Sequence, residues 1–195
     1  MSTPRLSYGH GGLDRASDRR RDEGWVREIL HRGTTRILPV WRYRHAVRRR
    51  DEGPQAIALA RSEAELVLES AAVTIFLGLR DGEAVFAVDC EIEAEEELTE
   101  QVGGRFVDLR RVGPLLDARE ASMLAFARGM IYWHRHHRFC SRCGQPTESL
   151  HGGHLRRCTD PSCAKESFPR TDPAAIMLVE HRPENGGPPR CLLGR

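Results

Sequence analysis

Four cysteines near the end of the sequence have the spacing of a metal site. They form the pattern C-x2-C-x14-C-x4-C, which is typical of one tetrahedral Zn²⁺ held by four thiolates. A glycine follows the second cysteine, where it lets the backbone turn tightly toward the ion. Because four thiolates leave no open coordination position, we expect one structural zinc per chain and no activation of water. The predicted ligands are Cys140, Cys143, Cys158 and Cys163.

Two disulfides in a secreted protein would be the alternative use of these cysteines. The first thirty residues are rich in Arg and lack the apolar run of a signal peptide. No stretch approaches eighteen consecutive apolar residues, so we expect no membrane span. A cytoplasmic chain would sit in a reducing environment that favours metal over disulfides. The other two cysteines, Cys90 and Cys191, lie in apolar strand-like segments and are interpreted as small core residues.

Three histidines before the first cysteine pair offer a possible second metal site. At helical spacing, however, only His134 and His137 share a face, and His136 points elsewhere. We favour a helix C-terminus at which cationic side chains interact favourably with the helix dipole. His137 lies close enough in sequence to Cys140 to support the zinc site indirectly.

No other pattern in the sequence identifies a catalytic residue. The segment FPRTDP contains Arg170 and Asp172, which could contact a substrate. We favour a structural role, in which the two prolines fix an extended backbone and the two charges pair locally. There is no Ser-His-Asp arrangement, P-loop or G-x-G-x-x-G pattern, and GHGG at 9–12 has no strand before it.

The net charge of +2 conceals a division along the chain. Residues 1–50 carry thirteen Arg against five acids, residues 51–120 carry six against seventeen, and residues 121–195 carry eleven basic residues against six acids. Such asymmetry could mark a nucleic-acid surface. The basic residues are not interleaved with aromatics, as single-strand binders require, so we favour charge complementarity within the molecule or between subunits.

The elements that must position these residues begin with a short helical pattern at 18–31. Segments 34–43 and 55–60 are predicted strands on either side of a polar turn region at 48–54. Segment 62–70 is predicted to be a short helix or strand. The clearest β signal follows, a hairpin of two strands joined by an Asp-Gly turn.

That hairpin is predicted to pair 73–79 with 84–89. An acidic loop or helix at 91–100 and a strand at 106–109 come next. A helix is then predicted from Asp117 to about Arg135, with Asp117 and Glu120 as its D-x-x-E start signal.

Beyond the cysteines, the apolar run AAIMLV at 174–179 predicts a buried strand, with a partner strand from Cys191. Lacking the rest of its sheet, such a strand would leave open edges and apolar surface that favour aggregation or pairing with a partner.

Several of these segments together resemble the NADH pyrophosphatases of the Nudix superfamily. The resemblance covers essentially the whole chain and is most specific over 133–179. It is carried by the segments LDRA (13–16), ILPVWR (37–42), WH (133–134), FCSRCG (139–144), GG (152–153), RC (157–158), Cys163 and FPRTDP (168–173). The resemblance implies a leading domain, a zinc ribbon and a C-terminal Nudix domain, commonly assembled as a homodimer. It also implies cleavage of NAD(H) to nicotinamide mononucleotide and AMP, and in some members removal of NAD caps from RNA.

Nudix chemistry requires the box G-x5-E-x7-R-E-U-x-E-E-x-G-U, whose glutamates gather Mg²⁺ or Mn²⁺. The family places this box after the strand that begins at Cys191, and it is absent from these 195 residues. A register that starts at Gly82 aligns Glu97, Leu98, Glu100 and Gly103 with the box, but Val88 replaces its first Glu. We interpret this register as chance and expect the 195-residue chain to be inactive by itself.

The prediction is therefore an α+β chain with a small mixed N-terminal domain, a four-cysteine zinc ribbon and the first two strands of an incomplete Nudix domain. The alternative function is a non-catalytic zinc-ribbon module that binds a protein or nucleic-acid partner. The predicted divisions are 1–17 flexible leader, 18–116 N-terminal domain, 117–136 connecting helix, 137–170 zinc ribbon and 171–195 start of the Nudix domain.

Overall fold

The first domain of the chain is built on a seven-stranded mixed sheet. The computed structural model describes residues 8–9, 12–170 and 176–192. The main path of the sheet runs β3-β2-β1-β6-β5, with β4 paired to β1 and β7 paired to β2; only β1 and β6 run parallel. The strands are β1 Arg36–Trp41, β2 Arg44–Arg50, β3 Gly53–Ala56, β4 Leu59–Ala60, β5 Ala71–Arg80, β6 Glu83–Cys90 and β7 Arg105–Val107.

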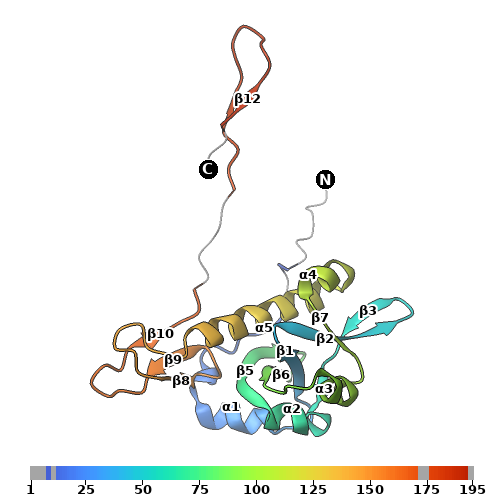
Figure 1. Ribbon diagram of the computed structural model, residues 1–195, viewed down its shortest axis with the longest axis vertical. Coiled ribbons are helices and arrows are strands. Elements are labelled where there is room, and N and C mark those ends of the chain that lie inside the picture. The colour runs from blue at the N-terminus through green and yellow to red at the C-terminus, as the bar shows by residue number, and fades with distance from the viewer. Residues whose placement is uncertain (1–7, 10–11, 171–175, 193–195) are drawn as a thin grey trace.

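Helices cover both faces of this sheet, which makes a three-layer α+β domain (Figure 1). The long helix α5 and the short α4 pack on one face, and α1, α2 and α3 pack on the other. Along β1 the side chains alternate between the layers, with Leu38 and Val40 facing α5 and Ile37 and Trp41 facing the opposite layer. The helices are α1 Glu23–Leu30, α2 Glu65–Glu69, α3 Glu95–Val102, α4 Leu109–Val112 and α5 Ala118–His136, with 3-10 turns at Arg19–Arg21, Arg61–Glu63 and Gly113–Leu115.

The predicted hairpin is confirmed by β5 and β6, which pair antiparallel around Asp81 and Gly82. Both turn residues have positive φ, 52° and 84°, as the tight Asp-Gly hairpin turn requires. Cys90 at the end of β6 is 2% exposed, which confirms it as a core residue.

The region at 48–54 is not the turn that its polarity suggested. The basic segment Arg44–Arg50 forms strand β2, which pairs with both β1 and β7, and the turn is confined to residues 51–52. The strand tolerates its arginines because they lie at its two ends, whereas His45, Ala46 and Val47 between them are buried.

The predicted helix before the cysteines is confirmed as α5. Its N-cap Asp117 accepts the backbone N–H of Arg119 at 2.9 Å. Glu120 does not complete a capping box as predicted, because its carboxylate instead accepts the backbone N–H of Ala56 at 3.2 Å and ties the helix to β3.

The open edge of β5 is covered by the N-terminal segment. Asp14 and Leu79 exchange two backbone hydrogen bonds of 2.9 and 2.7 Å, and Arg15 donates to the carbonyl of Leu77 at 3.2 Å. The predicted flexible leader at 1–17 is therefore wrong for residues 12–17, because an unpaired sheet edge offers them hydrogen bonds and packing.

A second, three-stranded antiparallel sheet follows α5, in the order β10-β9-β8, with β8 Thr147–Leu150, β9 Leu155–Cys158 and β10 Glu166–Ser167. The strands β11 Glu180–His181 and β12 Arg190–Cys191 then pair with each other. Residues 174–175 lie outside the described residues. The rest of the run predicted as a buried strand, Ile176–Val179, is not in a strand and is exposed, so that part of the prediction is wrong.

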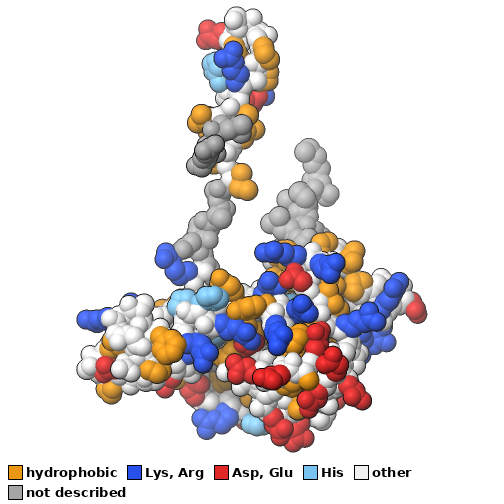
Figure 2. Space-filling view, viewed as in Figure 1, with side chains coloured by type: hydrophobic (Ala, Val, Ile, Leu, Met, Phe, Trp, Pro, Cys, Tyr) orange, Lys and Arg blue, Asp and Glu red, His pale blue; other side chains and the backbone are white. Residues whose placement is uncertain are grey.

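Cys191 was also expected in a core, but it is exposed, because the two-stranded ladder packs on no apolar layer. Figure 2 shows acidic side chains gathered around α2 and α3 and basic side chains over the β2–β3 hairpin. None of the helices in the described part of the chain has the length and apolarity that a membrane crossing requires.

His45 is an unusual core residue because it is fully buried on β2 and neither ring nitrogen has a hydrogen-bond partner among the described residues. Burial, together with the nearby Arg128 guanidinium, lowers the pKa of His45 to about 3. The ring is therefore neutral in the folded protein, while in the unfolded chain it takes up a proton near pH 6.5.

We expect His45→Leu to be neutral or stabilising at pH 7, because it removes two unsatisfied polar atoms from the core. The substitution should also flatten the acid dependence of stability. The wild type loses about 1.4 kcal/mol per pH unit from this residue as the pH falls from about 6.5 toward 3. Denaturant unfolding of both proteins at pH 7, 6 and 5 measures the difference, and parallel pH profiles would contradict it.

Candidate metal centre and adjoining pocket

The four predicted cysteines converge at one end of the small sheet. Their sulfur atoms all lie within 4.8 Å of one another. The Cys140 and Cys163 sulfurs are 3.8 Å apart, and the Cys143 and Cys158 sulfurs are 3.3 Å apart. A tetrahedral zinc with bonds of about 2.3 Å needs sulfurs roughly 3.8 Å apart, so this cluster has the dimensions of a four-thiolate zinc site.

Two tight turns present the sulfurs to a common point. In the first, Gly144 donates to the carbonyl of Cys140 at 2.9 Å and adopts a φ of 78°, as the glycine at this position predicted. In the second, Ala164 donates to the carbonyl of Asp160 at 2.8 Å and adopts a φ of 42°. The second turn therefore uses a left-handed residue without the glycine that this conformation favours.

Backbone N–H groups also polarise the cluster. Arg142 donates its N–H to the Cys140 sulfur at 3.4 Å, and with the Cys143 N–H it lowers the pKa of Cys140 to about 6. Burial raises the pKa of Cys158 to about 12. A cation supplies the charge that such a buried sulfur needs in order to ionise, so the donor set fits a thiolate-binding metal.

The opposite end of this small sheet is attached to the large one. The turn at 151–154 lies against β5, where Gly152 accepts the N–H of Phe76 at 2.8 Å and His154 donates to the carbonyl of Phe76 at 2.7 Å. A Cβ on Gly153 would lie 3.1–3.2 Å from atoms of Ile75, so the close approach depends on glycine.

His134 joins the end of α5 to the same turn. Its Nε2 donates to the carbonyl of Gly153 at 2.7 Å, and its Nδ1 accepts from Arg156 at 2.8 Å. Since Arg156 can only donate, the ring must be neutral, and burial lowers the pKa of His134 to about 4. The expected cationic helix end is therefore wrong for this residue.

The other two histidines do not join His134 in a second metal site. The Nδ1 of His136 donates to the carbonyl of Tyr132, and the Nδ1 of His137 donates to that of Trp133, both at 2.8 Å. These two rings are engaged by their own helix, and the carbonyl of His137 accepts the hydroxyl of Thr147 at 2.6 Å. His137 thus orients the start of the first cysteine turn through its backbone.

One ion pair that the sequence did not reveal also fixes the helix end. Arg135 donates two hydrogen bonds of 2.6 Å to the carboxylate of Asp89. Asp89 lies near the end of β6 and is 1% exposed. A buried acid inside an apolar strand pattern was the only sequence signal for this contact.

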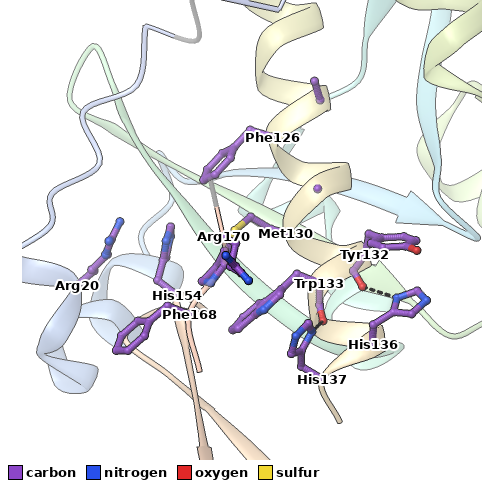
Figure 3. Close-up of a pocket in the computed structure, with 13 residues that line it drawn as sticks. Arg20, Phe126, Met130, Tyr132, Trp133, His136, His137, His154, Phe168 and Arg170 are labelled. Carbon is purple, nitrogen blue, oxygen red and sulfur yellow. Dashed lines mark hydrogen bonds between the residues drawn. The ribbon is translucent and has the colours of Figure 1, made fainter. Parts of the chain in front are cut away.

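A pocket of about 650 Å³ lies between α5, the N-terminal segment and the segment that leaves the small sheet (Figure 3). Aromatic and basic side chains line it together, and they include Phe126, Trp133, Phe168, Arg20 and Arg170. Aromatic faces beside cations suit flat, negatively charged ligands such as nucleotides. The predicted pairing of Arg170 with Asp172 cannot be placed, because Asp172 lies outside the described residues.

Protein-family models match both parts of this chain. A family model described as NADH pyrophosphatase-like rudimentary NUDIX domain matches residues 34–133, and one described as NADH pyrophosphatase zinc ribbon domain matches residues 135–168. The second match confirms the zinc-ribbon prediction at the level of the domain.

Among curated relatives, the chain is 36% identical to the human mitochondrial NAD(P)H pyrophosphatase NUDT13, over 58% of this chain and 32% of that protein. It is 36% identical to the chloroplastic Nudix hydrolase 19 of Arabidopsis thaliana, over 62% and 28%. It is 32% identical to the NAD-capped RNA hydrolase NudC of Stutzerimonas stutzeri, over 53% and 35%. The chain thus spans roughly a third of the length of these relatives.

The two cysteine turns make a matched test of backbone strain. Ala164→Gly should stabilise the zinc-loaded protein by about 0.5–1 kcal/mol, since glycine adopts positive φ without strain. Gly144→Ala should cost about 1–2 kcal/mol for the converse reason. Chemical denaturation in the presence of zinc measures both changes, and a destabilising Ala164→Gly would contradict the assignment.

Proposed function

The chain belongs to the NADH pyrophosphatase family of Nudix hydrolases, and we propose that it is the N-terminal and zinc-ribbon portion of an NAD(H) pyrophosphatase. The parent reaction is hydrolysis of NAD(H) to nicotinamide mononucleotide and AMP, with NAD-cap removal from RNA as the related activity. The observation that carries this proposal is the direct junction of the two family domains. They meet on the continuous helix α5, at Trp133–Arg135, where His134 and Arg135 tie both sheets together.

In this proposal Cys140, Cys143, Cys158 and Cys163 hold one structural Zn²⁺. The sulfur spacing, the two turns and the zinc-ribbon match support this assignment. We also propose a reducing, cytoplasmic location, because a reducing environment keeps the four cysteines available as metal ligands. A site of four thiolates has no position for water, so the ion would hold the ribbon without taking part in hydrolysis.

The register at Gly82 keeps its interpretation as chance, because its first half forms the turn and strand β6 of a hairpin, whereas the box needs a loop that leads to a helix. Helix α3 and its left-handed C-cap Gly103 fall where the box places its helix and second glycine. Val88, which falls where the first glutamate belongs, is fully buried in the sheet and cannot bind a cation. We propose that α3 does not hold the catalytic cations, although the first domain matches a family model described as a rudimentary NUDIX domain.

Substrate and subunit contacts are proposed on the α5 side of the molecule. The exposed aromatic residues Tyr132 and Phe168 adjoin the pocket with Trp133, which supports a surface that another part of the full-length enzyme covers. We propose that a homodimer partner and one half of NAD(H) meet the chain there. The Mg²⁺ or Mn²⁺ of the reaction would be bound by a Nudix box that these 195 residues do not contain.

Metal analysis of the purified chain should find one zinc per chain, and chelation should loosen residues 137–170. Hydrogen exchange would report the loosening as lost protection of the two cysteine turns. Cys143→Ser should abolish stoichiometric zinc binding, whereas the matched control Cys191→Ser, at an exposed cysteine outside the cluster, should retain it. A native protein without zinc, in which all four thiols react freely, would contradict the site.

We expect the zinc-loaded 195-residue chain to show no hydrolysis of NADH with Mg²⁺ or Mn²⁺, because no glutamate box holds the catalytic cations. Product formation is measured by chromatography of AMP, with a full-length relative such as NudC as the positive control. Turnover that survives repurification and is lost in a Glu97→Gln/Glu100→Gln double variant would assign the metal site to α3 and overturn the proposal.

A further inference from the structure

A small pocket lies at the joint between the two sheets, where α5 ends beside the ribbon (Figure 1). It has a volume of about 260 Å³ and shares no lining residue with the aromatic pocket described above. Its walls come from β5, β6, the end of α5 and β9, so both domains contribute to it. The charged residues of its lining are Asp89, Glu91, Arg135, Arg138 and Arg156.

The ion pair in this pocket contributes hydrogen-bond donors and no net charge. Both carboxylate oxygens of Asp89 accept hydrogen bonds of 2.6 Å from Arg135, which uses its Nε and Nη2 for these bonds. The Nη1 group of Arg135 therefore keeps both of its N–H donors. Since Asp89 is 1% exposed and fully engaged, it has no free oxygen with which to compete for other cations in the pocket.

Two further guanidiniums add positive charge that no acid in the joint pairs with. Arg156 donates to Nδ1 of His134 at 2.8 Å and to the hydroxyl and carbonyl of Thr147 at 2.7 and 2.6 Å, and all three acceptors are neutral. Arg138 is exposed, and its side chain makes no ion pair or hydrogen bond within the described part of the chain. Burial lowers the pKa of Arg156, and the nearby Arg138 guanidinium lowers it further.

The one remaining acid is Glu91, which is exposed and forms no side-chain hydrogen bond or ion pair among the described residues. Three arginines and two acids line the pocket, and His134 is neutral, so the net charge of the lining is +1. Solvent screens an exposed carboxylate more than it screens charges on the pocket wall. The pocket therefore combines excess positive charge with guanidinium N–H groups that have no acceptor.

We propose that this pocket binds a single phosphate-type oxyanion, either free phosphate or the phosphate of a mononucleotide, between the first domain and the zinc ribbon. Guanidinium forks match the oxygens of such an anion, and 260 Å³ is below the usual size of a site that encloses a larger ligand. Arg135 belongs to α5 and Arg156 to β9, so a bound oxyanion would bridge the two domains. This role is separate from the proposed function, because it involves neither the zinc ion nor hydrolysis.

The test is an NMR titration of the zinc-loaded 195-residue chain with inorganic phosphate, compared with NaCl at equal ionic strength. Phosphate should cause saturable shifts of the backbone amide signals around Arg138 and Arg156, and NaCl should not. A second titration uses AMP. Saturable shifts of the same signals with AMP would identify a mononucleotide phosphate as a ligand, and shifts with phosphate alone would identify the free ion; both results support the site.

Two exposed side chains of opposite charge give the titration a signed prediction. Arg138→Gln should weaken phosphate binding by about tenfold or more, because it removes charge-assisted hydrogen bonds. Glu91→Gln should tighten binding by about threefold or more, because it removes a negative charge beside the anion. Both variants should keep the melting temperature of the wild type in the absence of phosphate, since neither side chain has a partner to lose.

The matched control is Arg27→Gln, which removes the same charge from an exposed arginine outside the pocket and should change affinity by less than about twofold. Four results would each overturn the proposal: no saturable shift beyond that of NaCl, saturable shifts only in other parts of the chain, equal losses in Arg27→Gln and Arg138→Gln, or weaker binding in Glu91→Gln. No NADH is present and the zinc content is constant, so failure here is distinct from failure of the proposed pyrophosphatase role.

Discussion

The structure depends on how the open edge of β5 is covered. A strand at the edge of a sheet leaves backbone N–H and C=O groups without partners. The turn of the zinc ribbon satisfies both groups of Phe76, and the N-terminal segment satisfies those of Leu79. This docking needs a backbone that can come close, which explains the paired glycines at 152–153. Two sequence-distant segments are thereby fixed on one strand.

The two ends of the zinc ribbon are therefore held in different ways. The glycine turn and His134 fix one end of the ribbon to the sheet and helix, and the cysteines lie at its other end. A metal bound there would order the free end directly and would act on the attached turn at 151–154 only through strands β8 and β9. The neutral state of His134 is set by the attachment, because Arg156 and the carbonyl of Gly153 dictate its tautomer. The ribbon is therefore held at one end by the hydrogen bonds of the glycine turn and of His134, and at the other end by its cysteines.

The parts of the fold that sequence reasoning predicted correctly are those with local signals. The Asp-Gly hairpin and the Asp117 cap each depend on residues a few positions apart, and the cysteine pattern lies within the short segment from Cys140 to Cys163. Strand β2 was missed because its arginines were interpreted as turn residues. Their place in a sheet depends on pairing with β7, which lies far along the chain. Glu120 and Asp89 were missed for the same reason, since their partners are 64 and 46 residues away.

In the folded chain, some of the basic residues pair with acidic residues and others do not. Some of the N-terminal arginines meet the acidic middle of the chain, as Arg36 meets Glu83 and Arg44 meets Glu95. Arg48 and Arg49 of β2, Arg105 of β7 and Arg111 of α4 form no ion pair with an acid in the described part of the chain. Complementarity inside the molecule thus accounts for some of the basic residues and leaves these four without an acidic partner among the described residues. A cost of that kind is consistent with a surface that meets an anionic ligand.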